Sequence, residues 1–315
     1  MLLNIIFLLA GLVILIYGAN FLVDGGAALA HRLKVSSMVI GLTVVAFGTS
    51  TPELVVNIVS STAGSSALAL GNVLGSNIFN ILAILGITAL ITPLGVKKTT
   101  TWVEIPLAAF AAILILLLVN GEPTGIITRA EGICLLCFFA MFLLYTLTLS
   151  KYGAAGTGEE VEIKNYSAGK SVLFILLGLA GLIVGGRLLV YGAVNIAQSM
   201  GVSERIIGLT IVSIGTSLPE LATSIIAARK RNADIAIGNV VGSNIFNTFL
   251  ILGVSATIVP LKAPAGSLTD LITNIIASGL LFLFIFTGKG RKISRWEGAI
   301  FIVLYLIYLI LLILD

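Results

Sequence analysis

The chain has few of the residues that usually hold transition metals or carry redox chemistry. In 315 residues it contains one histidine and two cysteines, and only 10% of the residues are charged. A single histidine, His31, excludes a histidine-based zinc centre. Cys134 and Cys137 lie one helical turn apart in an apolar stretch, and without a second pair this spacing is typical of helix packing rather than of redox or metal chemistry.

What the chain has instead is apolar sequence. Hydrophobic residues make up 58% of it and the mean hydropathy is +1.15, values that indicate a polytopic membrane protein surrounded by lipid bilayer. The net charge of +4 does not predict nucleic-acid binding, because the basic residues lie in short connectors. The first apolar stretch lacks a charged leading segment and is too long for a signal peptide, so it is expected to be a mature helix.

Runs of about 20 apolar residues predict transmembrane helices. The sequence predicts ten, at roughly 2–30, 36–62, 67–91, 102–119, 127–150, 169–198, 203–229, 233–259, 268–287 and 294–314. The longest connector, 151–168, is rich in glycine and glutamate and is expected to be a solvated loop. It divides the chain into a first repeat, 1–150, and a second repeat, 169–315, with five predicted spans each.

The distribution of basic residues predicts the orientation. Of the 18 lysines and arginines, 14 follow odd-numbered spans, whereas only Arg129, Arg205 and Lys262 lie in the opposite connectors. Positive charge collects on the cytoplasmic side. We therefore expect both termini outside and the 151–168 loop in the cytoplasm.

The two halves repeat each other at an offset of 167 residues. About half of the positions are identical between 36–57 and 203–224, and ten of 14 are identical between 69–82 and 236–249. Because each half has an odd number of predicted spans, the second copy enters the membrane upside down. The expected fold is an all-α polytopic protein with two inverted five-helix repeats, an arrangement typical of secondary transporters.

The first repeated motif is Gly-Thr-Ser-x-Pro-Glu, at 48–53 and 215–220. Pro52 and Pro219 remove a helical hydrogen bond, so spans two and seven are predicted to be broken helices with free carbonyl oxygens. A charged residue at the centre of a span costs roughly 2.5–3.5 kcal/mol and usually marks an ion pathway, which makes Glu53 and Glu220 the strongest functional candidates. Carboxylates, hydroxyls and carbonyls together favour a hard cation.

The second repeated motif, Gly-Ser-Asn-Ile-Phe-Asn, occurs at 75–80 and 242–247. Its serine and last asparagine are four residues apart and therefore share a helix face. Asn77 and Asn244 lie off that face and are expected to bond to backbone. Asp24 is expected to be interfacial and Arg187 to snorkel, whereas Glu104, Asp234 and Asp270 lie at span ends, where the simplest expectation is solvation.

With these motifs in both halves, the chain resembles the calcium/cation antiporter superfamily, in particular its prokaryotic sodium/calcium exchanger branch. The resemblance covers essentially the whole length. It implies four cation sites between spans two, three, seven and eight, with spans one and six moving past them. The resemblance implies no cofactor, and it implies Ca²⁺ and Na⁺ as the transported ions.

The resemblance also implies roles for individual residues. Glu53 and Glu220, with the carbonyls of Thr49 and Thr216, would bind calcium. Sodium sites would be completed by Ala46, Ser50, Ser76, Ser213, Ser217 and Ser243. Asn80 and Asn247 would flank the central position. Potassium-dependent members of the superfamily have aspartate where Asn247 stands, which argues against potassium co-transport.

The sequence thus predicts a non-enzymatic antiporter of a prokaryotic inner membrane that exchanges calcium for sodium electrogenically, with a monomer sufficient for transport. Calcium/proton exchange by the same glutamates is the first alternative. A cation channel is a less favoured one, because two inverted halves closing one site suit alternating access better than a pore ring. An intramembrane enzyme lacks a metal-binding histidine pair or a base beside a serine.

Overall fold

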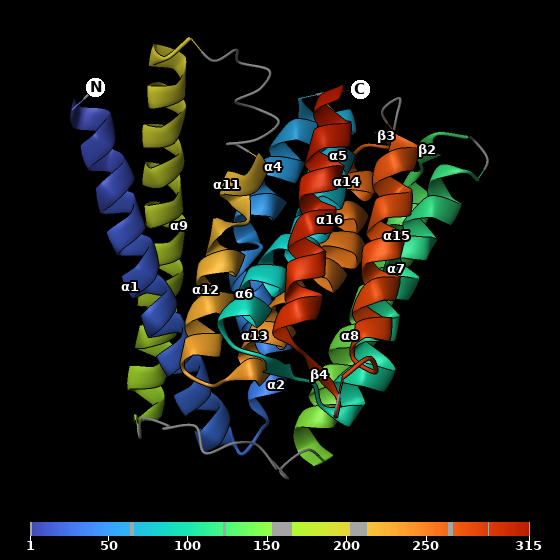
Figure 1. The fold of residues 1–315 in the computed structure, drawn as a ribbon. Coiled ribbons are helices and arrows are strands. Elements are labelled where there is room, and N and C mark those ends of the chain that lie inside the picture. Colours follow the sequence, from blue (N-terminus) through green and yellow to red (C-terminus); the bar gives the residue numbers. More distant parts are fainter. Residues whose placement is uncertain are drawn as a thin grey trace.

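The computed structural model describes residues 2–63, 66–121, 124–152, 166–201, 213–263, 267–288 and 290–314. Nearly all of the described chain is helical (Figure 1). The helices of the first half are α1 (Leu2–Leu33), α2 (Ser37–Ile40), η1 (Gly41–Val45), α3 (Ala46–Thr49), α4 (Thr51–Thr62), α5 (Ser66–Ile78), η2 (Phe79–Leu85), α6 (Gly86–Ile91), η3 (Thr100–Glu104), α7 (Ile105–Val119) and α8 (Arg129–Tyr152). Those of the second half are α9 (Ala168–Ser199), α11 (Ser213–Thr216), α12 (Leu218–Arg229), α13 (Ala233–Ile245), η5 (Phe246–Ile251), α14 (Leu252–Ile258), α15 (Ser267–Phe284) and α16 (Arg295–Leu314).

The predicted spans agree with these helices to within a few residues, except that 203–212 of the seventh prediction lie outside the described residues. Within the described ranges, eight helical stretches are long and apolar enough to cross a membrane. The bent pair Ser37–Thr49 and Thr51–Thr62 would make a ninth. Most of the predicted loop 151–168 also lies outside the described residues.

Two helical stretches form the centre of the bundle. Of the most apolar part of Ala233–Ile258, 94% is buried within the protein, and the corresponding share for Ala69–Ile91 is 78%. The other spanning candidates are buried only to 22–39% and present apolar side chains outward. Such outward apolar surface suits helices that face lipid.

Two short antiparallel strand pairs connect the two halves of the chain, and glutamates cap helices α8 and α16. Strand β1 (Leu94–Gly95) pairs antiparallel with β4 (Lys292–Ile293), and β2 (Ile126–Ile127) pairs antiparallel with β3 (Leu261–Lys262). Each ribbon therefore joins the two halves of the chain. The Glu131 carboxylate accepts a hydrogen bond from Thr128 N, and Glu297 likewise caps α16 by accepting from Ser294 N.

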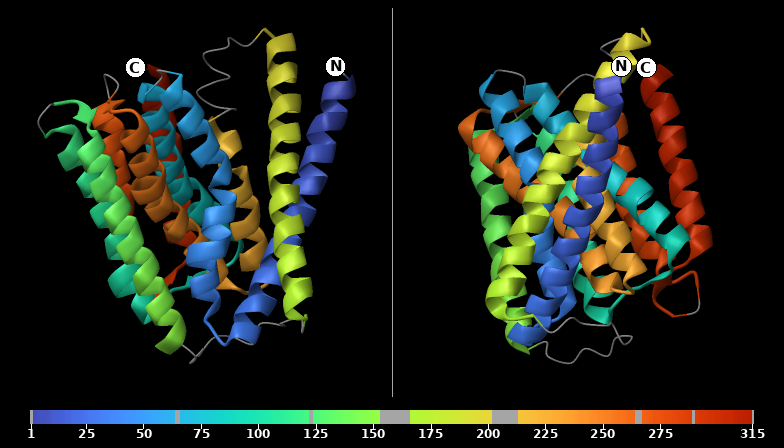
Figure 2. Two further views of the ribbon diagram at one scale, coloured as in Figure 1. Left: turned by 180° about the vertical axis from the view of Figure 1, so that it is seen from behind. Right: turned by 90° about the vertical axis from the view of Figure 1, so that its left-hand side faces the viewer.

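Helices α1 and α9 lie side by side at one edge of the bundle, and both chain ends lie at the same end (Figures 1 and 2). Their contact is built from glycines seven residues apart on each helix. A Cβ placed on Gly11, Gly18 or Gly25 would come within 2.5, 2.7 and 2.8 Å of backbone atoms of α9. Small residues at such positions permit close backbone packing.

Candidate cation site

The site begins where two helices break. Helix α3 ends at Thr49, Ser50 leaves the helical conformation at φ −82° and ψ 5°, and the following α4 is bent from its predecessor by 45°. In the second half, Ser217 has φ −91° and ψ 7° between α11 and α12. The breaks predicted around the two prolines are therefore present, one residue beyond Thr49 and Thr216.

Each break places a glutamate in the first turn of the helix that follows. Glu53 lies in the first turn of α4 and Glu220 in the first turn of α12, and each side chain is only 1% exposed. A helix N-terminus carries a partial positive charge that favours a carboxylate. That contribution is smaller than the cost of burying two carboxylates without counter-charge, so the pair must be neutralised by bound cations or by protons.

Serines connect the two breaks in a reciprocal way. Ser50 Oγ donates a hydrogen bond to Glu220 Oε1 at 2.9 Å, and Ser217 Oγ donates one to Glu53 Oε1 at 3.1 Å. Each serine thus serves the carboxylate of the other half. The second motif joins the same cluster, because Ser243 Oγ lies 3.0 Å from Ser50 Oγ, and Ser76 Oγ lies 3.2 Å from Ser217 Oγ.

Four asparagines extend the cluster. Asn80 Nδ2 donates to Asn244 Oδ1 at 2.9 Å, and Asn247 Nδ2 donates to Asn77 Oδ1 at 3.0 Å. Asn244 Nδ2 donates to the Asn77 carbonyl, as expected of a side chain bonding to backbone, whereas Asn77 Nδ2 donates to Thr248 Oγ1. Asn77 and Asn244 are therefore the residues that orient Asn80 and Asn247.

The orientation of these amides follows from the backbone. Asn80 lies in η2 and Asn247 in η5, two wide π-helical segments at equivalent places of the repeats. Such segments are rare and are frequent at functional sites. Each hydrogen bond of a π-helical segment spans one more residue than that of an α-helix, so the residues that follow the segment face a different direction from those of a regular α-helix.

Four oxygens of the cluster have no hydrogen-bond partner among the described residues. They are Glu53 Oε2, Glu220 Oε2, Asn80 Oδ1 and Asn247 Oδ1, and all four are buried. An unsatisfied buried polar atom costs about 1–3 kcal/mol. Since two carboxylate oxygens and two amide oxygens can only accept, a hard cation with oxygen ligands suits all of them at once.

A second ring of asparagines supports the cluster, and the sequence reasoning assigned these residues no role. Asn239 accepts a hydrogen bond from Thr49 Oγ1 at 3.0 Å and donates from Nδ2 to the Glu220 carbonyl at 3.2 Å. In the other half Asn72 donates to Asn57 Oδ1, and Asn57 donates to the Ala69 carbonyl. Asn72 and Asn239 occupy equivalent places in Gly-Asn-Val at 71–73 and 238–240. Comparison of the two halves could therefore have identified them from the sequence.

The remaining predicted ligands have different surroundings. Ala46 is fully buried, and its carbonyl accepts from Ser50 N at 3.0 Å and from Thr49 Oγ1 at 3.3 Å. Ser213 begins α11, and its side chain lies outside the described residues. Thr216 is half-buried and lines a cavity of about 550 Å³ between α9 and the two helix breaks, together with Pro52 and Pro219.

Four acidic side chains outside the site are partnered. Glu104 is fully buried and accepts from Tyr145 Oη at 2.7 Å, so its predicted solvation is wrong: Tyr145 of α8 reaches the carboxylate at the end of η3. Asp270 accepts from Tyr308 Oη at 2.8 Å. Asp234 pairs with Lys97 at 2.5 Å, and Asp24 pairs with Lys230 at 2.7 Å. Sequence periodicity did not indicate these partners.

The described part of the chain contains no group of three or more histidine, cysteine, aspartate or glutamate side chains placed to hold a metal ion. The site is therefore of another kind: two acids completed by neutral oxygens. Fold and site together define a polytopic helical membrane protein with a buried oxygen cluster shared between its two halves.

Comparison with known proteins identifies the family. The chain belongs to the sodium/calcium exchanger protein family, whose model matches residues 3–148 and 170–314. It is 31% identical over 347 residues to the sodium/calcium exchanger MaX1 of Methanosarcina acetivorans, covering 98% of both chains. It is also 34% identical to the inner membrane protein YrbG of Escherichia coli, covering 99% of this chain and 97% of YrbG. The predicted family is thereby confirmed.

A solved structure has the same fold. The sodium-calcium exchanger NCX_Mj, in a crystal soaked with 10 mM Na⁺ and 10 mM Sr²⁺, superposes with a TM-score of 0.84 at 34% identity, covering 98% of both chains. The chain is thus a member of a family of membrane cation antiporters. Its matched relatives are named as exchangers and membrane proteins rather than enzymes.

Proposed function

We propose that the protein is an antiporter that exchanges calcium for sodium at the cluster around Glu53 and Glu220. The observation that carries the proposal is the reciprocal arrangement of the two carboxylates: each is bonded by the serine of the other half, and each keeps one buried oxygen without a partner. Membership of the family and the likeness to the sodium-calcium exchanger NCX_Mj support the choice of ions.

Charge counting explains how one site couples two fluxes. Two ionised glutamates are neutralised by one Ca²⁺, whereas three Na⁺ leave one positive charge in excess. Because both loads need the same carboxylate oxygens, occupation by one excludes the other. Exchange of three sodium ions for one calcium ion is then electrogenic.

Residue by residue, we propose that the Glu53 and Glu220 side chains and the carbonyls of Thr49 and Thr216 hold calcium. Ser50, Ser76, Ser217 and Ser243 complete sodium sites, with the Ala46 carbonyl and Ser213 at the outer positions. Asn80 and Asn247 flank the centre through their unpartnered Oδ1 atoms. Because residue 247 is an asparagine rather than an aspartate, the site has two negative charges instead of three. This supports transport that does not need potassium.

The proposed mechanism is alternating access by two inverted five-helix repeats, 1–150 and 169–315. Its support is the equivalence of the contacts: at the offset of 167, Ser50 and Glu220 correspond to Ser217 and Glu53, and both pairs are hydrogen-bonded. Helices α1 and α9, which carry none of the proposed ligands, are the proposed moving elements.

We place the protein in a prokaryotic inner membrane with both termini outside and the 151–168 loop in the cytoplasm. The charge asymmetry of the connectors supports the orientation, and the name of YrbG supports the location. A monomer is proposed to suffice, because both halves of the site come from one chain.

The test is calcium uptake into sodium-loaded proteoliposomes with sodium, potassium and proton gradients imposed separately. The proposal expects uptake that depends on internal sodium and is indifferent to potassium and to the proton gradient. Uptake driven by the proton gradient alone would show calcium/proton exchange, and uptake without any counter-ion would show a channel.

A further inference from the structure

Helices α1 and α9 form a unit that is packed more closely within itself than against the rest of the bundle. Gly11, Gly18 and Gly25 face α9, and Gly178, Gly185 and Gly192, at the offset of 167, face α1. A Cβ on any of these six would come within 2.8 Å of backbone in the opposite helix. Separating the two helices would remove this close backbone packing. We therefore expect α1 and α9 to move together.

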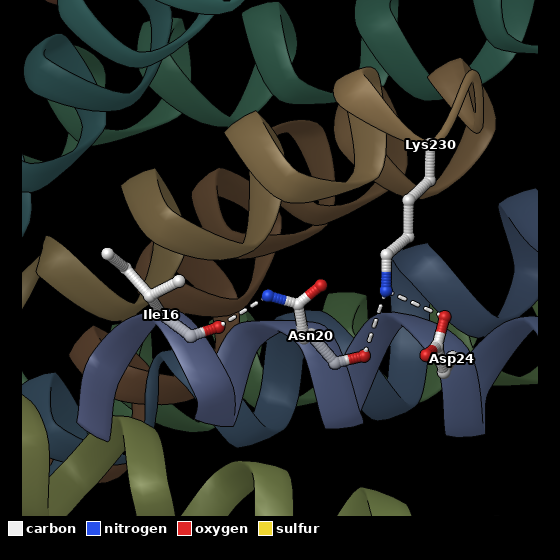
Figure 3. Close-up of polar contacts among 4 residues, drawn as sticks. All are labelled: Ile16, Asn20, Asp24 and Lys230. Atoms are coloured by element: carbon white, nitrogen blue, oxygen red, sulfur yellow. Dashed lines mark hydrogen bonds and ion pairs between the residues drawn. The ribbon is translucent and has the colours of Figure 1, made fainter. Parts of the chain in front are cut away.

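This unit is joined to the rest by an ion pair at one end. Lys230, directly after α12, places Nζ 2.7 Å from Asp24 Oδ1 and 3.3 Å from the Asn20 carbonyl, both on α1 (Figure 3). The Asp24 side chain is 13% exposed and that of Lys230 is 30% exposed. Partial burial strengthens such a pair over one in open water.

Helix α12 connects this ion pair to the candidate cation site. Glu220 is in its first turn and Lys230 follows its last residue. Ten residues of α-helix separate the two positions, which is about 15 Å along the axis. A change at Glu220 that tilts or shifts α12 therefore also displaces the lysine that holds α1.

The equivalent position in the other repeat differs. At the offset of 167, Asn20 and Asp24 correspond to Arg187 and Tyr191, and Lys230 corresponds to Ala63. Ala63 cannot form an ion pair. Arg187 and Tyr191 instead line the cavity of about 550 Å³ that reaches Pro52, Thr216 and Pro219. The structure is thus held closed between α1 and α12 and is hollowed between α9 and α4.

We propose that the Asp24–Lys230 ion pair is a latch that holds the α1–α9 unit against the far end of α12 and so favours the conformation whose cavity lies beside α9. Release of the latch lets the unit move and open the opposite side. The inference rests on the alternating access proposed above, but it concerns a specific ion pair rather than the transported ions.

The experiment measures the position of the α1–α9 unit without any transport. Spin labels are attached to cysteines introduced by Arg32→Cys, at the end of α1, and Arg295→Cys, at the start of α16. Both positions are exposed. Cys134 and Cys137, both free and exposed, are first replaced by serine. Distances between the labels are recorded in the otherwise unchanged chain and in the variants Asp24→Asn and Lys230→Gln.

A matched control is available in Asp234→Asn. Lys97 and Asp234 form an ion pair with similar side-chain exposures of 29% and 20%, but both lie outside the α1–α9 unit. If the ion pair is a latch, the fraction of molecules at a second label-to-label distance should be at least about fivefold larger in either latch variant than in the unchanged chain. The control variant should have the distance distribution of the unchanged chain.

The reversed pair, Asp24→Lys with Lys230→Asp, is expected to restore the original distribution, which separates loss of the ion pair from misfolding. Latch variants with the same distances as the control would overturn the proposal. Failure of the parent protein to exchange sodium for calcium would count against the proposed function alone, since the distances are measured independently of exchange.

Discussion

Removal of one carboxylate from the cluster is the sharpest perturbation that the structure suggests. In Glu220→Gln the side chain keeps its shape, but an amide nitrogen that donates hydrogen bonds replaces one carboxylate oxygen. It loses the charge that, with Glu53, balances a divalent cation. The Ser50 hydroxyl still has an acceptor in the remaining amide oxygen, so the fold is expected to persist.

The magnitude follows from the burial of the pair. Both glutamates are 1% exposed, so a divalent cation bound to Glu53 alone is left with an uncompensated charge in a buried site. Loss of one partner of a buried charge pair costs about 3–5 kcal/mol, which is about 10²- to 10⁴-fold in affinity. We expect calcium binding to weaken by at least about 100-fold, and Glu53→Gln to act alike because its surroundings are equivalent.

The assay is calorimetric titration of purified protein with calcium, with unfolding temperature as the check of folding. Glu104→Gln is the matched control, because Glu104 is also a fully buried carboxylate that accepts a hydrogen bond from a hydroxyl, but it lies in η3, away from the site. Its calcium affinity should equal that of the unchanged protein. Equal affinity in Glu220→Gln and Glu104→Gln would refute the assignment of the site.

Three further predictions concern selectivity, voltage and packing. Exchange by the unchanged protein should need no potassium, and Asn247→Asp should change the sodium or potassium dependence of calcium uptake more than it changes the unfolding temperature; strict potassium dependence of the unchanged protein would contradict the role proposed for Asn247. In sodium-loaded vesicles an inside-positive potential set with valinomycin should speed calcium uptake, because one net charge moved through the membrane is worth about 2.3 kcal/mol per 100 mV, and a rate insensitive to both signs of potential would indicate neutral exchange. Gly18→Val should destabilise the protein by about 1–3 kcal/mol in thermal unfolding, since its Cβ would lie 2.7 Å from Leu182 N, whereas Gly279→Ala, with nothing within 4 Å, should not; equal effects would argue against close packing of α1 on α9.

The sequence was sufficient for the features that a single helix determines. The length of the apolar runs predicted the spans, and the prolines in the Gly-Thr-Ser-x-Pro-Glu motif predicted the breaks. A proline removes a hydrogen bond from its own helix whatever the helix packs against. The repeated glutamates were predictable for a similar reason, since a carboxylate inside an apolar span is costly enough to stand out from the sequence of that span alone.

Features that depend on contacts between helices were not predictable. Periodicity places Ser50 on a helix face, but it does not indicate that its partner is Glu220 rather than Glu53. The π-helical segments that contain Asn80 and Asn247 have no composition signal, and the hydrogen bonds that join these residues to Asn244 and Asn77 across the two halves could not be read from either helix alone. Glu104 was expected in water because its position at a span end does not reveal that it is buried and that Tyr145 of α8 donates a hydrogen bond to it.

The central claim is that calcium and sodium compete for one set of oxygens shared by both halves. It is tested most directly by equilibrium binding of radioactive calcium to the purified protein at increasing sodium concentration. The account predicts one calcium ion per chain, displaced completely by sodium with a Hill coefficient above one, because several sodium ions replace each calcium ion. Calcium that stays bound at saturating sodium would show separate sites and would contradict the account.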